Sequence, residues 1–189
     1  MGLEDADKNG ILEEDLTSTI MGHVKMGYEY KQDCAISKSD PKYRSKPTLG
    51  DRVHCVVHVI NCCNIAVLGN NVFAKHENVR QHISKEGIPQ VAILTHCDEA
   101  CPKVGKDVTN VYKSIHINEK MNEVKQKLGI PLNNVFPVKN YATTAETDTN
   151  MDILLLYTFK RMLDFAGDFI ENSTIGEWDT HVFMKPATT

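Results

Sequence analysis

Four polar residues placed directly after a short apolar run carry groups that could bind a ligand. The run covers 91–94 and is followed by Thr95, His96, Cys97 and Asp98. An apolar run without alternation predicts a strand buried on both faces, and ligands of open α/β sheets bind beyond such strand ends. An ionised carboxylate accepts two hydrogen bonds, so Asp98 has the chemistry to read the edge of a guanine base. Capping of the next helix or turn is the alternative role for this Asp.

A second polar segment occupies the same place after the next predicted strand. A helix stop at Gly129 is followed by an apolar run over 135–138 and then by Lys139, Asn140 and Tyr141. Parallel strands bring their carboxyl ends to one edge of the sheet, where a nucleotide base would lie. The two polar segments are therefore predicted to form one base-binding edge. For Lys139, packing of the aliphatic stem is favoured over a chemical role.

Hydrophobic periodicity predicts the elements that must position these residues. We expect strands over 53–60, 91–94 and 135–138, a polar loop over 28–51, and helices over 14–24, 72–86, 107–128 (broken before Asn118) and 152–171. Strands that alternate with helices predict a parallel sheet, although three strands are few for a doubly wound domain. The last helix should bury one stripe, made of Leu155, Phe159, Met162, Ala166 and Phe169.

Composition narrows the functional class. At 189 residues with 41% hydrophobic and 24% charged residues, the chain can form one globular domain with a sizeable core. Its 21 basic and 25 acidic residues form no basic stripe, so we expect no nucleic-acid partner. No apolar run approaches the length of a transmembrane helix, and we expect no membrane partner either.

Cysteine and histidine residues raise the question of a metal site. None of the six cysteines forms a C-x-x-C pair, which favours reduced thiols in a cytoplasmic protein. Zinc ligation by Cys97, Cys101 and a histidine remains an alternative with weak support from the spacing. His54 and His58 share a face of the predicted strand, and a pair of core histidines is favoured over a metal site. We therefore expect no metal-binding residues.

An acidic segment near the amino terminus partly matches a calcium-binding loop. Residues 5–10 fit the first six positions, but Leu16 stands at the twelfth position, where a bidentate Glu is needed. A polar, switch-like loop that caps the following helix is the favoured interpretation. Calcium binding is the weaker alternative.

Several motifs follow one another in a specific order. They are Met1-Gly2-Leu3-Glu4, Gly22-His23-Val24, Asp51-Arg52-Val53-His54-Cys55-Val56, Leu94-Thr95-His96-Cys97-Asp98, Gly129-Ile130-Pro131, Pro137-Val138-Lys139-Asn140-Tyr141, Asp152-Ile153-Leu154-Leu155-Leu156 and Met162-Leu163. This order resembles the carboxyl-terminal part of the GTPase-like domain of the interferon-induced protein 44 family, including its 44-like members. The resemblance covers roughly residues 1–172, and the combination is more specific than any single motif.

The resemblance implies an α/β fold that is an incomplete Ras-like P-loop NTPase fold. We expect a parallel three-strand sheet flanked by helices, with the first strands and the phosphate loop missing from this chain. A partial GTPase-like domain would cover 1–172, followed by a frayed tail over 173–189. The chain contains no G-x-x-x-x-G-K-[ST] loop. Gly2 matches the end of the switch motif, whose backbone amide would face a γ-phosphate.

Five further positions match the base-binding residues of the family. Asp98 corresponds to the guanine-reading carboxylate, and Thr95 and His96 to positions that brace the base. Asn140 and Tyr141 correspond to the segment whose backbone amides face the guanine carbonyl. GTP or GDP would bind weakly and Mg²⁺ would not be expected, because phosphate contacts supply most of the affinity. We therefore expect no GTP hydrolysis by the chain alone.

The resemblance implies a role in the immune, antiviral response in the cytoplasm. The alternative is a nucleotide-free interaction module in innate immune signalling. In a Ras-like sheet the strand at 53–60 pairs with the first strand of the domain, which this chain lacks. We therefore expect a protein partner, or self-association, through the exposed edge of that strand.

Overall fold

The computed structural model describes residues 10–65, 70–142 and 146–182. Within these ranges three strands form one parallel sheet in the order β1-β2-β3: β1 Val56–Asn61, β2 Gln90–Thr95 and β3 Val135–Pro137. Helices flank this sheet, so the predicted α/β class and the three-strand parallel sheet are confirmed. The Ras-like assignment stays a prediction.

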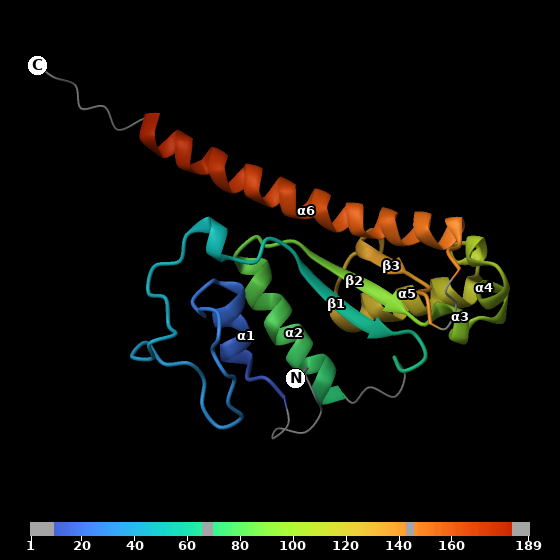
Figure 1. Cartoon of the computed structure of the whole chain (residues 1–189), viewed down its shortest axis with the longest axis horizontal. Coiled ribbons are helices and arrows are strands. Elements are labelled where there is room, and N and C mark those ends of the chain that lie inside the picture. The colour runs from blue at the N-terminus through green and yellow to red at the C-terminus, as the bar shows by residue number, and fades with distance from the viewer. Residues whose placement is uncertain (1–9, 66–69, 143–145, 183–189) are drawn as a thin grey trace, which may run out of the picture.

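Helices cover both sides of the sheet. They are α1 Glu13–Ile20, α2 Asn70–Lys85, α3 Cys97–Ala100, α4 Pro102–Lys106, α5 Ile115–Leu128 and α6 Thr149–Val182. Figure 1 shows α6 along one side of the sheet, with α2 and α5 on the other. None of the described helices is both long and apolar enough to cross a lipid bilayer.

The core lies between the sheet and α5. In β1 and β2, Ile60 lies opposite Leu94, and both side chains are buried. Met121, Val124 and Leu128 of α5 pack into the same cluster at the spacing the sequence predicts. Gly129 ends α5 in the left-handed conformation with φ 66°, as expected for a helix-terminating glycine.

The helix predicted over 107–128 is interrupted earlier than expected. Pro102 starts the short α4, and Asp107 then accepts a hydrogen bond from the Thr109 backbone N–H and forms a 3₁₀ turn. The long helix begins only at Ile115, because the Ser114 side chain caps it by accepting from the Ile117 N–H. The predicted break before Asn118 is therefore wrong by one turn.

The last helix differs from its prediction in length and in its buried face. It begins at Thr149, where the Asp148 carboxylate accepts from two backbone N–H groups, and it continues to Val182. The segment from Ser173, expected to be frayed, is thus helical as far as Val182.

The side of α6 that the sequence predicts to be buried differs from the side that the structure buries. The buried residues are Met151, Leu154 and Thr158, whereas Phe159 is 55% exposed. Leu155, Met162, Ala166 and Phe169 are only partly buried. The apolar residues of this helix exceed what a three-strand sheet covers, so periodicity alone could not select the buried face.

The segment between α1 and β1 is held by specific contacts although it is mostly irregular. The buried Asp15 carboxylate of α1 accepts a 2.7 Å hydrogen bond from the Ile36 N–H. Arg44 pairs with Asp51 at 3.1 Å. The long polar loop predicted over 28–51 is therefore an ordered layer packed beside α1.

Candidate functional site

The two predicted polar segments lie at the same edge of the sheet. The Val138 N–H donates to the Leu94 carbonyl over 2.8 Å, and the Cys97 N–H donates back to the Val138 carbonyl over 3.4 Å. These bonds extend the β2–β3 pairing beyond the strands themselves. The loop that carries Asp98 is thus attached directly to the loop that carries Asn140.

Thr95 and His96 form the rim of this edge. The Thr95 hydroxyl donates to the Ile60 carbonyl over 3.3 Å, and His96 Nδ1 lies 3.0 Å from the same hydroxyl oxygen. His96 has φ 58° and is the one non-glycine residue with a positive φ in the described part of the chain. Left-handed backbone costs roughly 1–2 kcal/mol for an L-residue, and such outliers gather at functional sites. The imidazole is exposed.

Asp98 lies in the first turn of α3. Its side chain is partly buried, and within the described ranges its carboxylate makes no hydrogen bond or ion pair. The alternative role as a helix cap is not used, since His96 occupies the N-cap position without a side-chain bond. Gly105 of α4 packs closely behind, because a Cβ there would lie 3.1 Å from the Asp98 carbonyl oxygen. The backbone of Asp98 is therefore packed against α4, which fixes the position from which its side chain projects.

The segment after β3 is bonded within the chain more than predicted. Asn140 Oδ1 accepts from the Tyr141 N–H over 2.8 Å, so this amide is already occupied. The Tyr141 hydroxyl donates to Asp152 and accepts from the Asp148 N–H, each over 2.7 Å. Lys139 Nζ donates to the Gly105 carbonyl over 3.1 Å, a bond within the chain that differs from the expected packing of its aliphatic stem. A base would reach the Tyr141 amide only after the Asn140 side chain turns away.

The remaining predicted ligand sites have different outcomes. Gly2 and residues 5–9 of the calcium-like loop lie outside the described residues. Leu16, at the position that should supply the closing carboxylate, packs instead against a core cluster that contains Ile83. Across the ranges that the structure describes, no group of three or more His, Cys, Asp or Glu side chains could hold a metal ion.

The two histidines of the first strand have separate partners. His54 precedes β1, and its Nε2 lies 2.8 Å from the Leu49 carbonyl oxygen. The Nε2 of the buried His58 lies 3.1 Å from Gln90 Oε1. Burial lowers the pKa of His58, which keeps this ring neutral. The histidines therefore do not form a joint site.

Buried thiols lie beneath the edge. All six cysteines are free, and Cys62 and Cys97 are fully buried. The Cys97 thiol donates to the Leu94 carbonyl over 3.3 Å. Its hydrogen bond with Cys62, together with burial, raises the pKa of Cys97, so this thiol stays protonated. Cys97 therefore acts as a packed, uncharged core residue.

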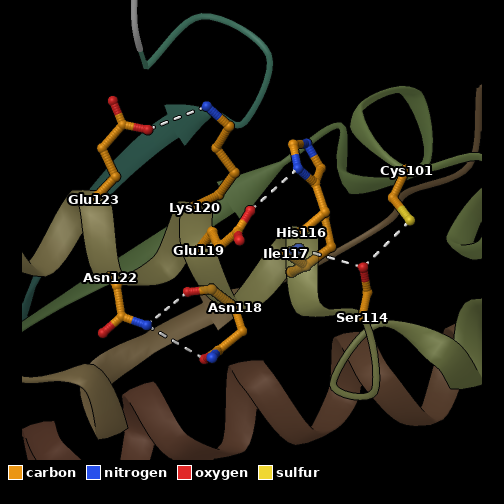
Figure 2. A network of polar contacts seen from close by, with 9 residues as sticks. All are labelled: Cys101, Ser114, His116, Ile117, Asn118, Glu119, Lys120, Asn122 and Glu123. Carbon is orange, nitrogen blue, oxygen red and sulfur yellow. Dashed lines mark hydrogen bonds and ion pairs between the residues drawn. The ribbon is translucent and has the colours of Figure 1, made fainter.

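The sequence interpretation missed a cavity of about 530 Å³ between α4 and α5. Ser114 is among the residues that line this cavity. Its hydroxyl oxygen lies 3.3 Å from the sulfur of Cys101 and 3.3 Å from the Ile117 nitrogen, and Figure 2 shows these contacts. The Ser114 hydrogen bond lowers the pKa of Cys101. Ser114 before a helical pattern is a capping signal in the sequence, but nothing in the pattern pairs it with Cys101.

Comparisons with known proteins give the family. No family model and no solved structure matches this chain. The chain is 30% identical over 177 residues to interferon-induced protein 44-like of Homo sapiens, and the aligned residues make up 94% of this chain and 39% of that protein. It is 28% identical over 172 residues to interferon-induced protein 44 of Pan troglodytes, covering 91% and 38%, and 28% identical over 163 residues to that of Mus musculus, covering 86% and 39%. The chain thus spans less than half of the length of these relatives. The similarity extends over nearly all of this chain's own length and supports its assignment to the interferon-induced protein 44 family, which includes the 44-like members.

Proposed function

We propose that this protein has an interferon-induced role in the immune, antiviral response and that the edge beyond β2 and β3 contacts a guanine base. The names of the relatives support the first part. The second part rests on one observation: the Cys97 N–H to Val138 carbonyl bond holds the Asp98 loop against the Asn140 loop.

The chemistry of guanine fits this arrangement. Its N1–H and 2-amino groups are adjacent donors, and the two oxygens of the Asp98 carboxylate accept both. The exposed His96 ring can lie against the face of the base. Rotation of Asn140 would free the Tyr141 amide for the guanine carbonyl oxygen. With base contacts alone, the proposed affinity is weak, and any GTP or GDP would bind at its base.

Titration with guanosine tests the proposal without involving phosphate contacts. We expect amide shifts in an NMR spectrum at residues 95–98 and 140–141, with adenosine giving none. Asp98→Asn should lose guanosine and gain xanthosine, because the amide donates to the C2 carbonyl that replaces the amino group. Glu99→Gln, a neighbouring carboxylate change on α3, is the matched control. Guanosine shifts that survive Asp98→Asn would contradict the proposal.

A nucleotide-free interaction module is the second candidate, and the outer edge of β1 favours it. The Val56 and Cys62 N–H groups donate to carbonyls of the β2 segment, so alternation turns the backbone groups of Val57 and Val59 away from β2. Within the described residues no strand pairs with that side, and Val59 is 66% exposed. Such an edge can accept an added strand from a partner or a second copy.

Hydrogen exchange distinguishes a free edge from an occupied one. In the isolated monomer we expect fast exchange at the Val57 and Val59 amides and slow exchange at His58 and Ile60. Binding of a strand-supplying partner should slow the first pair. Strong protection of Val57 and Val59 in a stable monomer would refute the open edge.

A further inference from the structure

The cavity between α4 and α5 has a lining of one charge sign. Its volume of about 530 Å³ falls within the roughly 300–1,000 Å³ of sites that take small molecules. Apart from a thiol, its ionisable side chains are Lys103, Lys113 and His116, and no acidic residue of the described chain lines it. The whole chain has 25 acidic and 21 basic residues, so this lining departs from the average composition. The cavity therefore favours a ligand that carries negative charge.

Nearby acids offset this basic lining only in part. The Glu119 carboxylate lies 3.7 Å from His116 Nδ1, in a pair that is open to solvent. Exposed pairs of this kind contribute little. Lys103 and Lys113 are exposed residues on long, flexible stems, so their ammonium groups can move to meet an anion.

A thiol belongs to the same lining. Cys101 is only 7% exposed, and the cavity is the opening through which a ligand would reach it. The Cys101 sulfur points toward the Ser114 hydroxyl oxygen, 3.3 Å away (Figure 2). The Ser114 bond, the Val104 N–H and the Lys103 charge lower the pKa of this thiol, and burial opposes them. The thiolate is the reactive form of cysteine, and reactive cysteines lie in electropositive surroundings.

Other cysteines of the chain lack this combination of access and thiolate character. Burial raises the pKa of Cys55 to about 11 and also raises the pKa of the exposed Cys63. Cys62 has a lowered pKa, but it is 0% exposed and is hydrogen-bonded to the equally buried Cys97. Cys101 thus joins a favoured thiolate to a cavity with a basic lining.

We propose that this cavity receives a small anionic disulfide and that Cys101 is its site of covalent attachment. The Cys101 thiol gives its proton to solvent, and the thiolate attacks one sulfur of the disulfide. An S–S bond forms between Cys101 and that half, the original S–S bond breaks, and the other half leaves as a thiolate that takes up a proton. The disulfide is the oxidant, so Cys101 is oxidised and the departing half is reduced. Lys103 and Lys113 attract the carboxylates of the ligand during this exchange.

Two disulfides of opposite charge test the proposal. Glutathione disulfide carries a net negative charge, and cystamine carries two ammonium groups. The full chain is incubated with each near neutral pH, and mass spectrometry follows attachment at each of the six cysteines. The exposed Cys34 and Cys63 act as internal references for the intrinsic reactivity of each probe. Relative to these two, Cys101 should favour glutathione disulfide over cystamine by about tenfold.

Lysine variants show whether the lining causes this preference. Lys103→Gln combined with Lys113→Gln should reduce the preference of Cys101 to that of the two reference cysteines. Lys85→Gln combined with Lys125→Gln removes the same charge at exposed positions outside the lining and should leave the preference unchanged. A Cys101 that shows no greater preference for glutathione disulfide than the references would overturn the proposal. So would a preference that survives the loss of both lining lysines.

Discussion

At the carboxyl ends of β2 and β3 the polar groups of the loops are largely paired within the chain, whereas along the outer side of β1 the backbone groups of Val57 and Val59 face no described strand. The first region holds its loops by the Cys97, Lys139 and Tyr141 bonds. Its loops are therefore held in place by bonds within the chain. The second region has regular geometry but incomplete pairing, which suits an added chain. The comparison separates loops whose polar groups the chain pairs by itself from a strand edge that the described chain leaves unpaired.

The same contrast runs around α6. Its inner side buries Thr158, whose hydroxyl donates to the Leu154 carbonyl over 2.9 Å. On its outer side Leu156 is 66% exposed, because it lies half a turn from Thr158. Apolar character alone thus does not tell which side of a helix the chain itself covers.

Proline substitutions on β1 should give the largest difference in stability between its paired side and its outer side. Ile60→Pro removes an N–H that alternation directs toward β2, and the unpaired carbonyl left behind costs about 1–3 kcal/mol beyond the lost side-chain packing. Val59→Pro removes an N–H that faces outward, so the monomer should lose much less stability and association through this edge should fall. Urea unfolding of both variants measures the difference. Equal destabilisation would mean that the outer side of β1 is paired.

Alanine substitutions at the same two neighbours have the next largest effect. Ile60 is 5% exposed in the core cluster, and Ile60→Ala should cost roughly 2–5 kcal/mol of unfolding free energy. Val59→Ala, at a site 66% exposed, should stay within about 0.5 kcal/mol. Thermal or denaturant unfolding checks both. A cost at Val59 that approaches the cost at Ile60 would show that β1 is covered on both faces.

Local sequence signals predicted the supporting elements of the site. The unalternating run before Thr95 predicts a strand, and the structure places β2 there. The stop at Gly129 and the core positions Met121, Val124 and Leu128 follow from helix periodicity and glycine geometry. These features depend on a few neighbouring residues and on burial, both of which leave a pattern in the sequence.

Features fixed by contacts between distant residues could not be predicted. The left-handed backbone of His96 lies at the point where the chain turns from β2 to α3 beneath the β3 loop, and no local rule requires it there. The bond between Asn140 and the Tyr141 N–H competes with the expected ligand contact. The start of α5 at Ile115 depends on the Ser114 cap, which the apolar spacing does not register.

The buried His58 of β1 should make the stability of the protein depend on pH. Burial lowers the pKa of His58 below its usual value near 6.5, and the Arg80 guanidinium acts in the same direction. As the pH falls below about 6.5, the unfolded chain takes a proton that the folded chain resists, so stability declines until the lower folded pKa is passed. His58→Gln should flatten this decline, measured by urea unfolding between pH 7.5 and 5 in steps of about one unit. His82→Gln, at an exposed position on α2, is the control, and an unchanged slope in His58→Gln would contradict the assignment.

The smallest effect is expected at Ser114, inside the region that satisfies its own polar groups (Figure 2). The Ile117 N–H donates to the Ser114 oxygen, and the Ser114 hydroxyl also forms a hydrogen bond with the Cys101 sulfur 3.3 Å away, which lowers the pKa of that thiol. Ser114→Ala should therefore cost about 1 kcal/mol for the lost cap and raise the pKa of Cys101 toward that of an ordinary thiol. The rate of alkylation at Cys101 against pH, resolved by mass spectrometry, measures the second effect. Ser114→Thr keeps the hydroxyl and should preserve both properties, because this hydroxyl can form the same two hydrogen bonds. A Cys101 profile that does not change in Ser114→Ala would show that the thiol is set by its burial and by the backbone around it, and the network would then serve α5 alone.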